Sequence, residues 1–135
     1  MPSTDPRRRA VITGLGAVTP IGNDHPTFWA NAKAGVSGGG PITHFDASDL
    51  DVRIAAEVKD FDPSIGMDRK MARRMSRFIH FAMAAGKEAV ADAGLDFSDW
   101  TPEQRDRVSV IVNTGGGGLE QVIDGHVTTM ERGPR

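Results

Sequence analysis

Residues 107–120 read RVSVIVNTGGGGLE, a run of β-branched residues that passes directly into four consecutive glycines. Valine and isoleucine favour strands, so the sequence predicts a strand over 108–113. The residues that follow, LEQVIDGHVTTMERG at 119–133, place apolar side chains at helical spacing. A strand joined to a helix by a flexible bend is the repeating unit of α/β proteins. This stretch therefore predicts an α/β fold.

The rest of the chain continues the alternation of strands and helices. The further predicted elements are strands over 8–15 and 52–58, a helix over 25–35 capped by Asn23 or Asp24, and a periodic segment over 71–90 that stops at Gly94 and forms one long helix or two in tandem. Alternation of this kind predicts a layered fold with a mostly parallel sheet. At 135 residues the chain is one domain or one piece of a larger domain.

The composition excludes several classes of protein. The chain is 39% hydrophobic and 25% charged with a formal net charge of -2, so its overall balance favours neither nucleic acid nor a membrane as partner. No apolar run approaches the roughly 20 residues of a membrane-spanning helix, and the N-terminal residues do not form a signal peptide. We therefore expect a cytoplasmic protein.

The sequence shows no recognisable pattern of catalytic or metal-binding residues. The absence of cysteine excludes disulfides, thiolate metal sites and a cysteine nucleophile within these residues. The four histidines show no metal-ligand spacing, and no nucleophile is paired with a base. The sequence therefore predicts no catalytic residue, no metal and no cofactor in this chain.

Two glycine-rich loops can be tested against phosphate-binding motifs. Residues 14–19, GLGAVT, have Thr19 where a dinucleotide fingerprint has its third glycine, and Pro20 where the helix should begin. Residues 114–120, TGGGGLE, lack the Lys-Ser or Lys-Thr of a P-loop. A nucleotide-binding α/β domain is thus a minor alternative. The glycines instead permit close backbone approach, either to a ligand or partner or simply for packing.

A cluster of cations lies in residues 67–80, MDRKMARRMSRFIH. On a continuous helix the cations would share one face and the apolar residues the opposite face; the cations are Arg69, Lys70, Arg73, Arg74 and Arg77, and the apolar residues are Met71, Met75 and Phe78. Such a face is either simply solvated or a docking patch for an acidic or phosphate-bearing partner. RNA is less favoured because no aromatic residues interleave with the charges.

Several segments together resemble one protein family. They are RRAVITGLGAVTPIGN, FWANAKAGVSG, HFDASDLDVRIAAEVKDFDP, MDRKMARRMSRFIHFAMAAGKEAVADAGL, VSVIVNTGGGGLE and ERGPR. In this order, from Arg8 to Arg135, they resemble the N-terminal part of β-ketoacyl-acyl-carrier-protein synthases of the synthase II type. The resemblance implies a thiolase-like layered αβαβα fold made of two similar halves, of which residues 1–135 would be the incomplete first half. It also implies a homodimer formed through the N-terminal half.

The resemblance implies an acyltransferase activity for the complete protein. Members of the family condense an enzyme-bound acyl group with malonyl-acyl-carrier protein, which releases carbon dioxide and lengthens the chain by two carbons in fatty acid biosynthesis; a polyketide pathway stays open. Their nucleophilic cysteine, two histidines and a lysine lie beyond the position of Arg135, so we expect this segment alone to be inert. A non-catalytic chain-length partner subunit of the same fold is the main alternative.

The resemblance also implies roles for particular residues. Lys70, Arg73, Arg74 and Arg135 correspond to the cations that dock the acyl-carrier protein. Gly115, Gly116 and Gly117 correspond to the loop that gates the acyl pocket near the subunit contact. Many relatives carry isoleucine or phenylalanine at the position of Gly116, so we expect a wider pocket mouth here.

Overall fold

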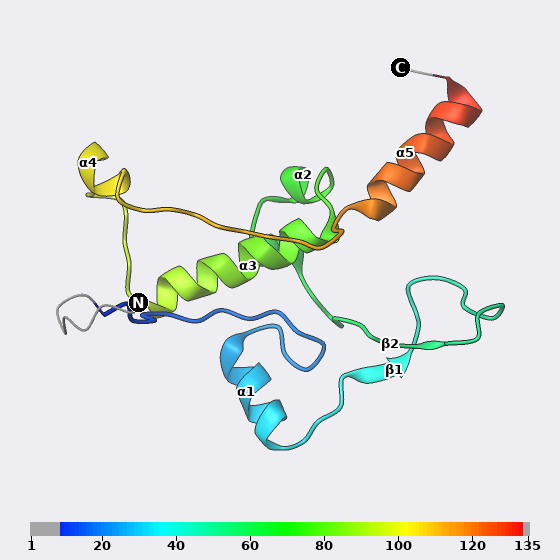
Figure 1. The fold of residues 1–135 in the computed structure, drawn as a ribbon, viewed down its shortest axis with the longest axis horizontal. Helices are drawn as coiled ribbons and strands as arrows, with labels where there is room; N and C mark the ends of the chain where they lie inside the picture. The colour runs from blue at the N-terminus through cyan, green and yellow to red at the C-terminus, as the bar shows by residue number, and fades with distance from the viewer. Residues whose placement is uncertain (1–8, 134–135) are drawn as a thin grey trace, which may run out of the picture.

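The computed structural model describes residues 9–133, and its longest helix, α3 (Arg77–Asp92), runs through the centre of the molecule (Figure 1). The other elements are α1 (His25–Lys33), β1 (Gly39–Pro41), β2 (Ile54–Ala56), the 3-10 helix η2 (Pro63–Ile65), α2 (Arg69–Ala72), α4 (Pro102–Arg105) and α5 (Leu119–Arg132). Two extended segments, residues 9–18 and 108–116, run along opposite sides of α3 (Figure 1). Helix α5 projects away from α3 at the end of the second segment.

Helix α1 forms where the sequence predicted it. The carboxylate of Asp24 accepts a hydrogen bond from the backbone N–H of Thr27 at 2.7 Å, which satisfies one of the free donors at the start of the helix. Pro26 lies in the first turn, and Gly35 follows the helix with a positive φ of 70°. The predicted start is therefore confirmed and Asp24, not Asn23, is the cap, while the helix ends at Lys33, two residues before the predicted end.

The periodic segment over 71–90 forms two helices rather than one. Asp68 caps α2 by accepting from the N–H groups of Lys70 and Met71 at 2.8 and 2.9 Å. At Ser76 the backbone is extended (φ -65°, ψ 154°), and α3 begins at the next residue. The tandem arrangement is thus correct, and it means that residues 69–80 do not share one continuous helical face.

The predicted parallel sheet does not form within residues 9–133. The sheet found there is a two-stranded antiparallel pair, in which Gly40 pairs with Ala55. Strand β2 lies at the centre of the strand predicted over 52–58. Residues 9–15 and 109–113 are extended, but no backbone hydrogen bond joins them to another segment. A β-branched run favours the extended conformation, whereas a strand also needs a neighbouring segment with which to pair.

Residues 14–16 make the closest approach between a loop and α3. A Cβ atom at Gly16 would lie 1.9 Å from the carbonyl oxygen of Ala85, and one at Gly14 would lie 2.2 Å from that of Ala89. Only glycine lets the main chain pass this close to a helix. The glycines of the 14–19 motif are therefore used for packing, which leaves no room for a phosphate there and disfavours the nucleotide-binding alternative.

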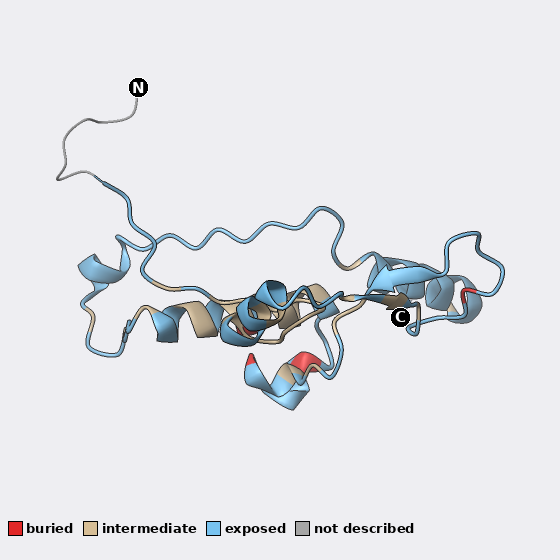
Figure 2. Cartoon of the chain, turned by 90° about the horizontal axis from the view of Figure 1, so that it is seen from below, coloured by how far each residue is buried: buried red, intermediate tan, exposed pale blue. Residues whose placement is uncertain are grey.

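Little of the apolar surface is buried within the described residues. Figure 2 shows small patches of buried residues, which are Ala47, Gly66, Met67, Ala72, Ser76 and Ala84. Large apolar side chains remain exposed on the segment 108–112 and on α5, including Ile111 and Ile123. Extended apolar surfaces of this kind mark contacts with other protein surfaces. No helix within residues 9–133 is both long and apolar enough to cross a bilayer.

Candidate functional site

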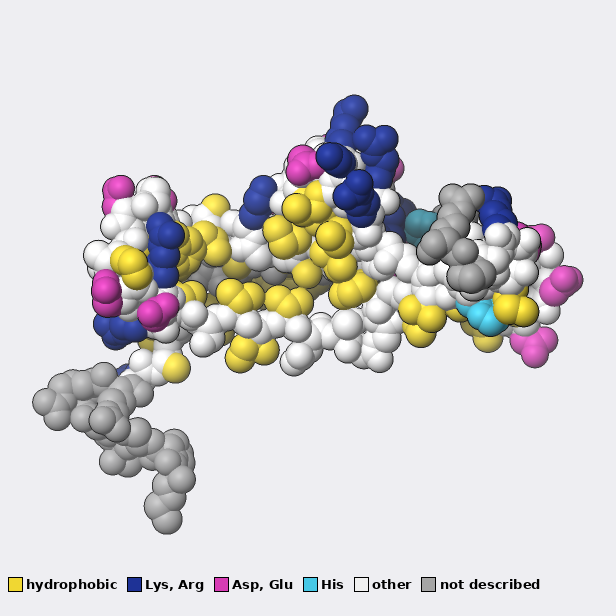
Figure 3. Space-filling view, turned by 90° about the horizontal axis from the view of Figure 1, so that it is seen from above, with side chains coloured by type: hydrophobic (Ala, Val, Ile, Leu, Met, Phe, Trp, Pro, Cys, Tyr) yellow, Lys and Arg dark blue, Asp and Glu magenta, His cyan; other side chains and the backbone are white. Residues whose placement is uncertain are grey.

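The basic cluster lies on α2, the following turn and the first residue of α3. Figure 3 shows Lys and Arg side chains gathered at one projecting part of the molecule, with hydrophobic side chains directly beside them. The structure brings together Lys70, Arg73 and Arg74, three of the predicted docking residues, on this surface, and all three are exposed. The fourth, Arg135, lies outside the described residues.

The cations of this cluster differ in their contacts. Arg77 donates from Nη2 to the carbonyl oxygen of Val58 at 2.7 Å and lies over the ring of Phe81, with its Cζ atom 5.0 Å from the ring centroid. Arg73 donates from Nε to the carbonyl of Arg69 at 3.3 Å. The Lys70 and Arg74 side chains make no hydrogen bond or ion pair within residues 9–133. Within the described part of the chain, these two charges are therefore available to a partner.

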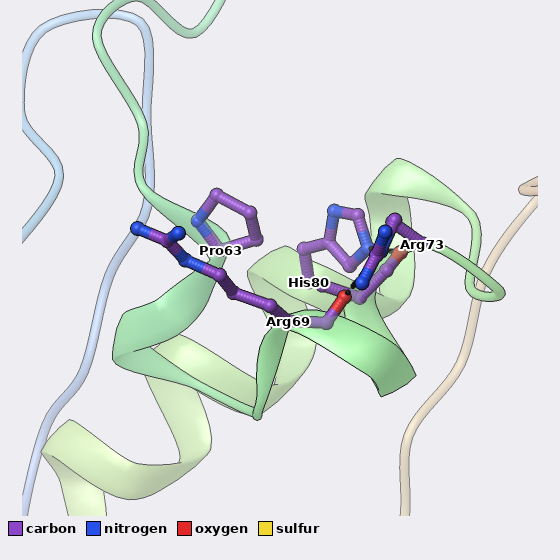
Figure 4. A pocket seen from close by; sticks show the side chains of 5 residues that line it. Pro63, Arg69, Arg73 and His80 are labelled. Carbon is purple, nitrogen blue, oxygen red and sulfur yellow. Dashed lines mark hydrogen bonds between the residues drawn. The ribbon is translucent and has the colours of Figure 1, made fainter.

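Two concavities lie on either side of α2. The first has a volume of about 430 Å³ and is lined by Pro63, Arg69, Ala72, Arg73 and His80 (Figure 4). Its histidine donates from Nε2 to the carbonyl oxygen of Ala72 at 2.9 Å, which ties α3 to the end of α2. Figure 4 shows Arg73 beside His80 and the Arg69 side chain extending toward Pro63. The two guanidinium groups therefore do not converge on one point.

The second concavity has a volume of about 230 Å³ and combines charge with apolar surface. Its lining residues are Asp68, Lys70, Met71, Arg74 and Met75. The prediction that the methionines lie opposite the cations is wrong. Because α2 ends at Ala72, Arg74 and Met75 belong to the turn, and the helical spacing no longer separates the two kinds of side chain.

The four glycines at 115–118 have unequal surroundings. A Cβ atom at Gly117 would lie 2.5 Å from Cγ of Phe78, and Gly118 has a positive φ of 86° at the start of α5. At Gly116 a Cβ atom would meet only Leu119 Cδ1, at 3.5 Å, and at Gly115 it would meet nothing within 4 Å. Close approach and special backbone geometry thus require glycine at positions 117 and 118, whereas 115 and 116 have space for a side chain.

One cluster was not found from the sequence. Glu88 accepts hydrogen bonds at Oε1 from the backbone N–H and Nδ1 of His25, at 2.8 and 3.0 Å, and at Oε2 from the N–H of Ala17 at 2.9 Å. Asp92, one turn later, accepts from the N–H of Leu15 at 2.8 Å. Leu15 and Ala17 are two residues apart on an extended segment, which spans about 6.6 Å. Glu88 and Asp92 are four residues apart on a helix, which spans about 6 Å. The spacing of the two carboxylates therefore matches the spacing of the two backbone N–H groups that they bind. In the sequence, the only sign of this cluster was the spacing of Glu88 and Asp92, four residues apart in a mostly apolar helix.

These carboxylates have a structural role. Each accepts hydrogen bonds from main-chain N–H groups, so they hold residues 15–17 and the start of α1 against α3. No group of three or more potential metal ligands occurs within residues 9–133.

Comparison with known proteins agrees with the sequence resemblance. The family model described as "Beta-ketoacyl synthase, N-terminal domain" matches residues 7–133. The chain belongs to this family. The 3-oxoacyl-(acyl-carrier-protein) synthase 2 of Synechocystis sp. is 44% identical over 128 residues, and that of Staphylococcus aureus (strain N315) is 45% identical over 128 residues. Both alignments cover 95% of this chain and 30% of the relative.

A solved structure supports the same fold. The ishigamide ketosynthase/chain length factor matches with a TM-score of 0.76 and 33% sequence identity, over 91% of this chain and 30% of that chain. The thiolase-like fold expected from the resemblance is therefore confirmed. The chain spans about a third of the length of the relatives it matches.

Proposed function

We propose that this chain is the N-terminal part of a 3-oxoacyl-acyl-carrier-protein synthase. The complete enzyme would elongate acyl chains in fatty acid biosynthesis by decarboxylative condensation of an enzyme-bound acyl group with malonyl-acyl-carrier protein. Relatives that are 44% and 45% identical bear this name. The observation that carries the proposal is the exposed basic surface on α2 and the turn after it, where Lys70 and Arg74 have no partner within residues 9–133.

In this proposal the basic surface, here Lys70, Arg73 and Arg74, docks the acyl-carrier protein. The whole chain is mildly acidic, so a local cluster of cations creates a positive field against a weakly negative background. Such a field steers an acidic partner and raises the association rate, and salt screens it within about 10 Å at 0.1 M. Arg135 is proposed to extend this surface, although it lies outside the described residues.

The bond-forming chemistry of the proposed reaction needs residues that this chain does not provide. The acyl group must first be held on a nucleophile, but the chain contains no cysteine. Activated serine or threonine would need a base within hydrogen-bond reach. Among the described residues the histidine contacts are His25 with Glu88 and His80 with a backbone carbonyl. We therefore assign recognition and pocket shaping to this segment, and the covalent step to the remainder of the synthase.

The glycine loop is proposed to border the acyl pocket, with Gly116 at its gate beside Gly115 and Gly117. Gly116 has space for a larger side chain, since only Leu119 Cδ1 lies within 4 Å of an added Cβ atom. A side chain at Gly116 could therefore narrow a neighbouring passage without disturbing the loop itself. With glycine there, we propose that the enzyme accepts long acyl chains.

The exposed apolar surfaces are proposed to be subunit and domain contacts. Helix α5 has an apolar face with Leu119, Val122, Ile123, Val127 and Met130, all exposed in this structure. A face of this kind suits the contact between two copies of the enzyme in a homodimer. We further propose that the enzyme acts in the cytoplasm.

A non-catalytic chain-length subunit is the second candidate. One structural match is the ishigamide ketosynthase/chain length factor, whose name pairs a ketosynthase with such a factor. Both kinds of subunit would share the architecture described here. They differ in whether the complete protein carries a nucleophile for the acyl group.

An elongation assay on the complete synthase tests the proposal. Purified enzyme is incubated with acyl-carrier-protein thioesters and malonyl-carrier protein, and the 3-oxoacyl product and released carbon dioxide are measured together. We expect both in equal amounts and a strong preference for carrier-bound over coenzyme A-bound malonate. Absence of product from enzyme that is folded and dimeric would favour the chain-length subunit.

A further inference from the structure

The concavity beside the basic surface has an apolar floor that simple charge steering does not require. Met71 is 44% exposed and Met75 is 37% exposed, and both line it together with Lys70 and Arg74. Its volume of about 230 Å³ exceeds the roughly 150 Å³ of an engineered protein cavity that binds benzene. The space is therefore large enough for one aliphatic side chain.

The concavity is held in shape by its surroundings. Asp68 fixes the start of α2 through two backbone N–H groups, and Ser76 closes the turn with only 3% exposure. Ala72, between the two methionines in sequence, is buried and anchors the helix. Met71 and Met75 are thus presented by a fixed backbone, while their flexible side chains can adapt to what they contact.

The charges around the methionines indicate the kind of partner. Lys70 and Arg74 are uncommitted within residues 9–133, whereas the one carboxylate in the lining, Asp68, accepts from the backbone. A cationic rim around an apolar centre follows the usual plan of a protein interface, which has an apolar core and a polar edge. The complementary surface is an acidic one that carries an exposed apolar side chain.

We infer that Met71 and Met75 form an apolar socket in which a hydrophobic side chain of an acidic carrier protein binds, while carboxylates of the same partner bind Lys70 and Arg74. This inference rests on the proposed function, because it takes the carrier protein as the partner. It assigns different kinetic roles to the charges and to the socket. Charges set the rate of encounter, and the socket sets the lifetime of the complex.

The concavity on the other side of α2 does not suit this role. Its histidine is engaged with the carbonyl of Ala72, and its two arginine side chains extend toward different ends (Figure 4). Its apolar lining consists of Pro63 and Ala72, of which Ala72 is buried. An apolar side chain of a partner therefore finds more contact surface between Met71 and Met75.

Association and dissociation rates of the complete synthase with acyl-carrier protein test the socket. Met71→Gln replaces the thioether with a polar group of similar length, and Met71→Leu is the matched control that stays apolar. We expect Met71→Gln to raise the dissociation rate roughly fivefold, with an unchanged association rate and an unchanged dependence on salt. Met71→Leu should stay within about twofold of the wild type. Met75→Gln is a second test of the same socket.

The outcomes separate this inference from the proposed function. An unchanged dissociation rate in both glutamine variants overturns the socket. If Lys70→Gln with Arg74→Gln then still slows association, the docking surface stands and only the socket is wrong. If neither the charge variants nor the methionine variants change binding, the docking surface itself is wrong. Thermal unfolding of each variant shows that it is folded, which is expected because both methionines are exposed.

Discussion

The ring of Phe78 occupies the space that a side chain at Gly117 would need, with only 2.5 Å between Phe78 Cγ and an added Cβ atom. At the preceding residue, Gly116, the added atom would lie at an ordinary distance of 3.5 Å from Leu119 Cδ1. Adjacent glycines in one loop are therefore under different constraints. Position 117 is fixed by packing, whereas position 116 has space for a side chain.

Substitution should separate these two positions. We expect Gly117→Ala to destabilise the complete enzyme by about 1 to 3 kcal/mol, because an extra methyl group overpacks the contact with Phe78. Gly116→Ala should change the free energy of unfolding by less than about 0.5 kcal/mol. Denaturant unfolding measures both values.

The contact with Phe78 can be isolated by a double-mutant cycle. If the ring is the obstacle, Gly117→Ala should cost much less in a Phe78→Ala background than in the wild type. An equal cost in both backgrounds would show that the strain at position 117 comes from its backbone or from Thr114 Oγ1, which would lie 2.6 Å away.

A bulky side chain at Gly116 should alter substrate selectivity. We expect Gly116→Ile and Gly116→Phe to lower kcat/KM for the longest acyl chains by roughly tenfold or more while short chains are nearly unaffected, since a clash costs several times RT. Elongation rates over a series of acyl-carrier-protein thioesters measure this, with Gly116→Ala as the small control. A selectivity profile that does not change with side-chain size would remove Gly116 from the gate.

Glu88 should be important for stability despite its distance from the basic surface. Its carboxylate accepts three hydrogen bonds, from Ala17 and from two nitrogens of His25. Glu88→Ala leaves partly buried donors without a partner, so we expect a loss of about 2 to 3 kcal/mol in unfolding free energy. Glu120→Ala, an exposed substitution on α5, is the control. Equal stability of the two variants would show that residues 15–17 are held by other contacts.

The cap of α1 should depend on pH. Hydrogen bonds from the backbone and side chain of Thr27 lower the pKa of Asp24. A lowered folded-state pKa means that the carboxylate stabilises the fold above its unfolded pKa, and that this contribution is lost as pH falls through the folded value. Wild-type enzyme should therefore exceed Asp24→Asn in stability at pH 7 and lose this advantage progressively as the pH falls below the ordinary pKa of 3.8 and through the lowered folded-state pKa. If the wild type remained more stable than Asp24→Asn at low pH, the predicted direction of the pH dependence would be wrong.

Local signals in the sequence predicted the helices well. Asp24, Pro26 and Gly35 each act within a few residues, so the boundaries of α1 could be predicted without tertiary information. The stop at Gly94, which has a φ of 64°, follows the same logic. Helix capping depends on hydrogen bonds between residues close in sequence, so helix boundaries can be predicted from the sequence.

Strand pairing and the site were less predictable because they depend on distant residues. The β-branched run at 108–113 is extended, but nothing in its sequence specifies a partner, and it has none within residues 9–133. Likewise, helical spacing placed Met71 and Met75 away from the cations. The end of α2 at Ala72 brings them into the same concavity. The family resemblance implied a docking role for the basic residues, but it did not indicate the apolar surface between them.

The surface around α2 is proposed to dock an acidic carrier protein, and stopped-flow kinetics measure this association directly. We expect the complete synthase with Lys70→Glu and Arg74→Glu to associate with acyl-carrier protein at least about tenfold more slowly, with a flatter dependence on salt. The same charge change at Lys33 and Arg107, which are exposed elsewhere, should have little effect. Association that is equally fast in both double variants would contradict the account.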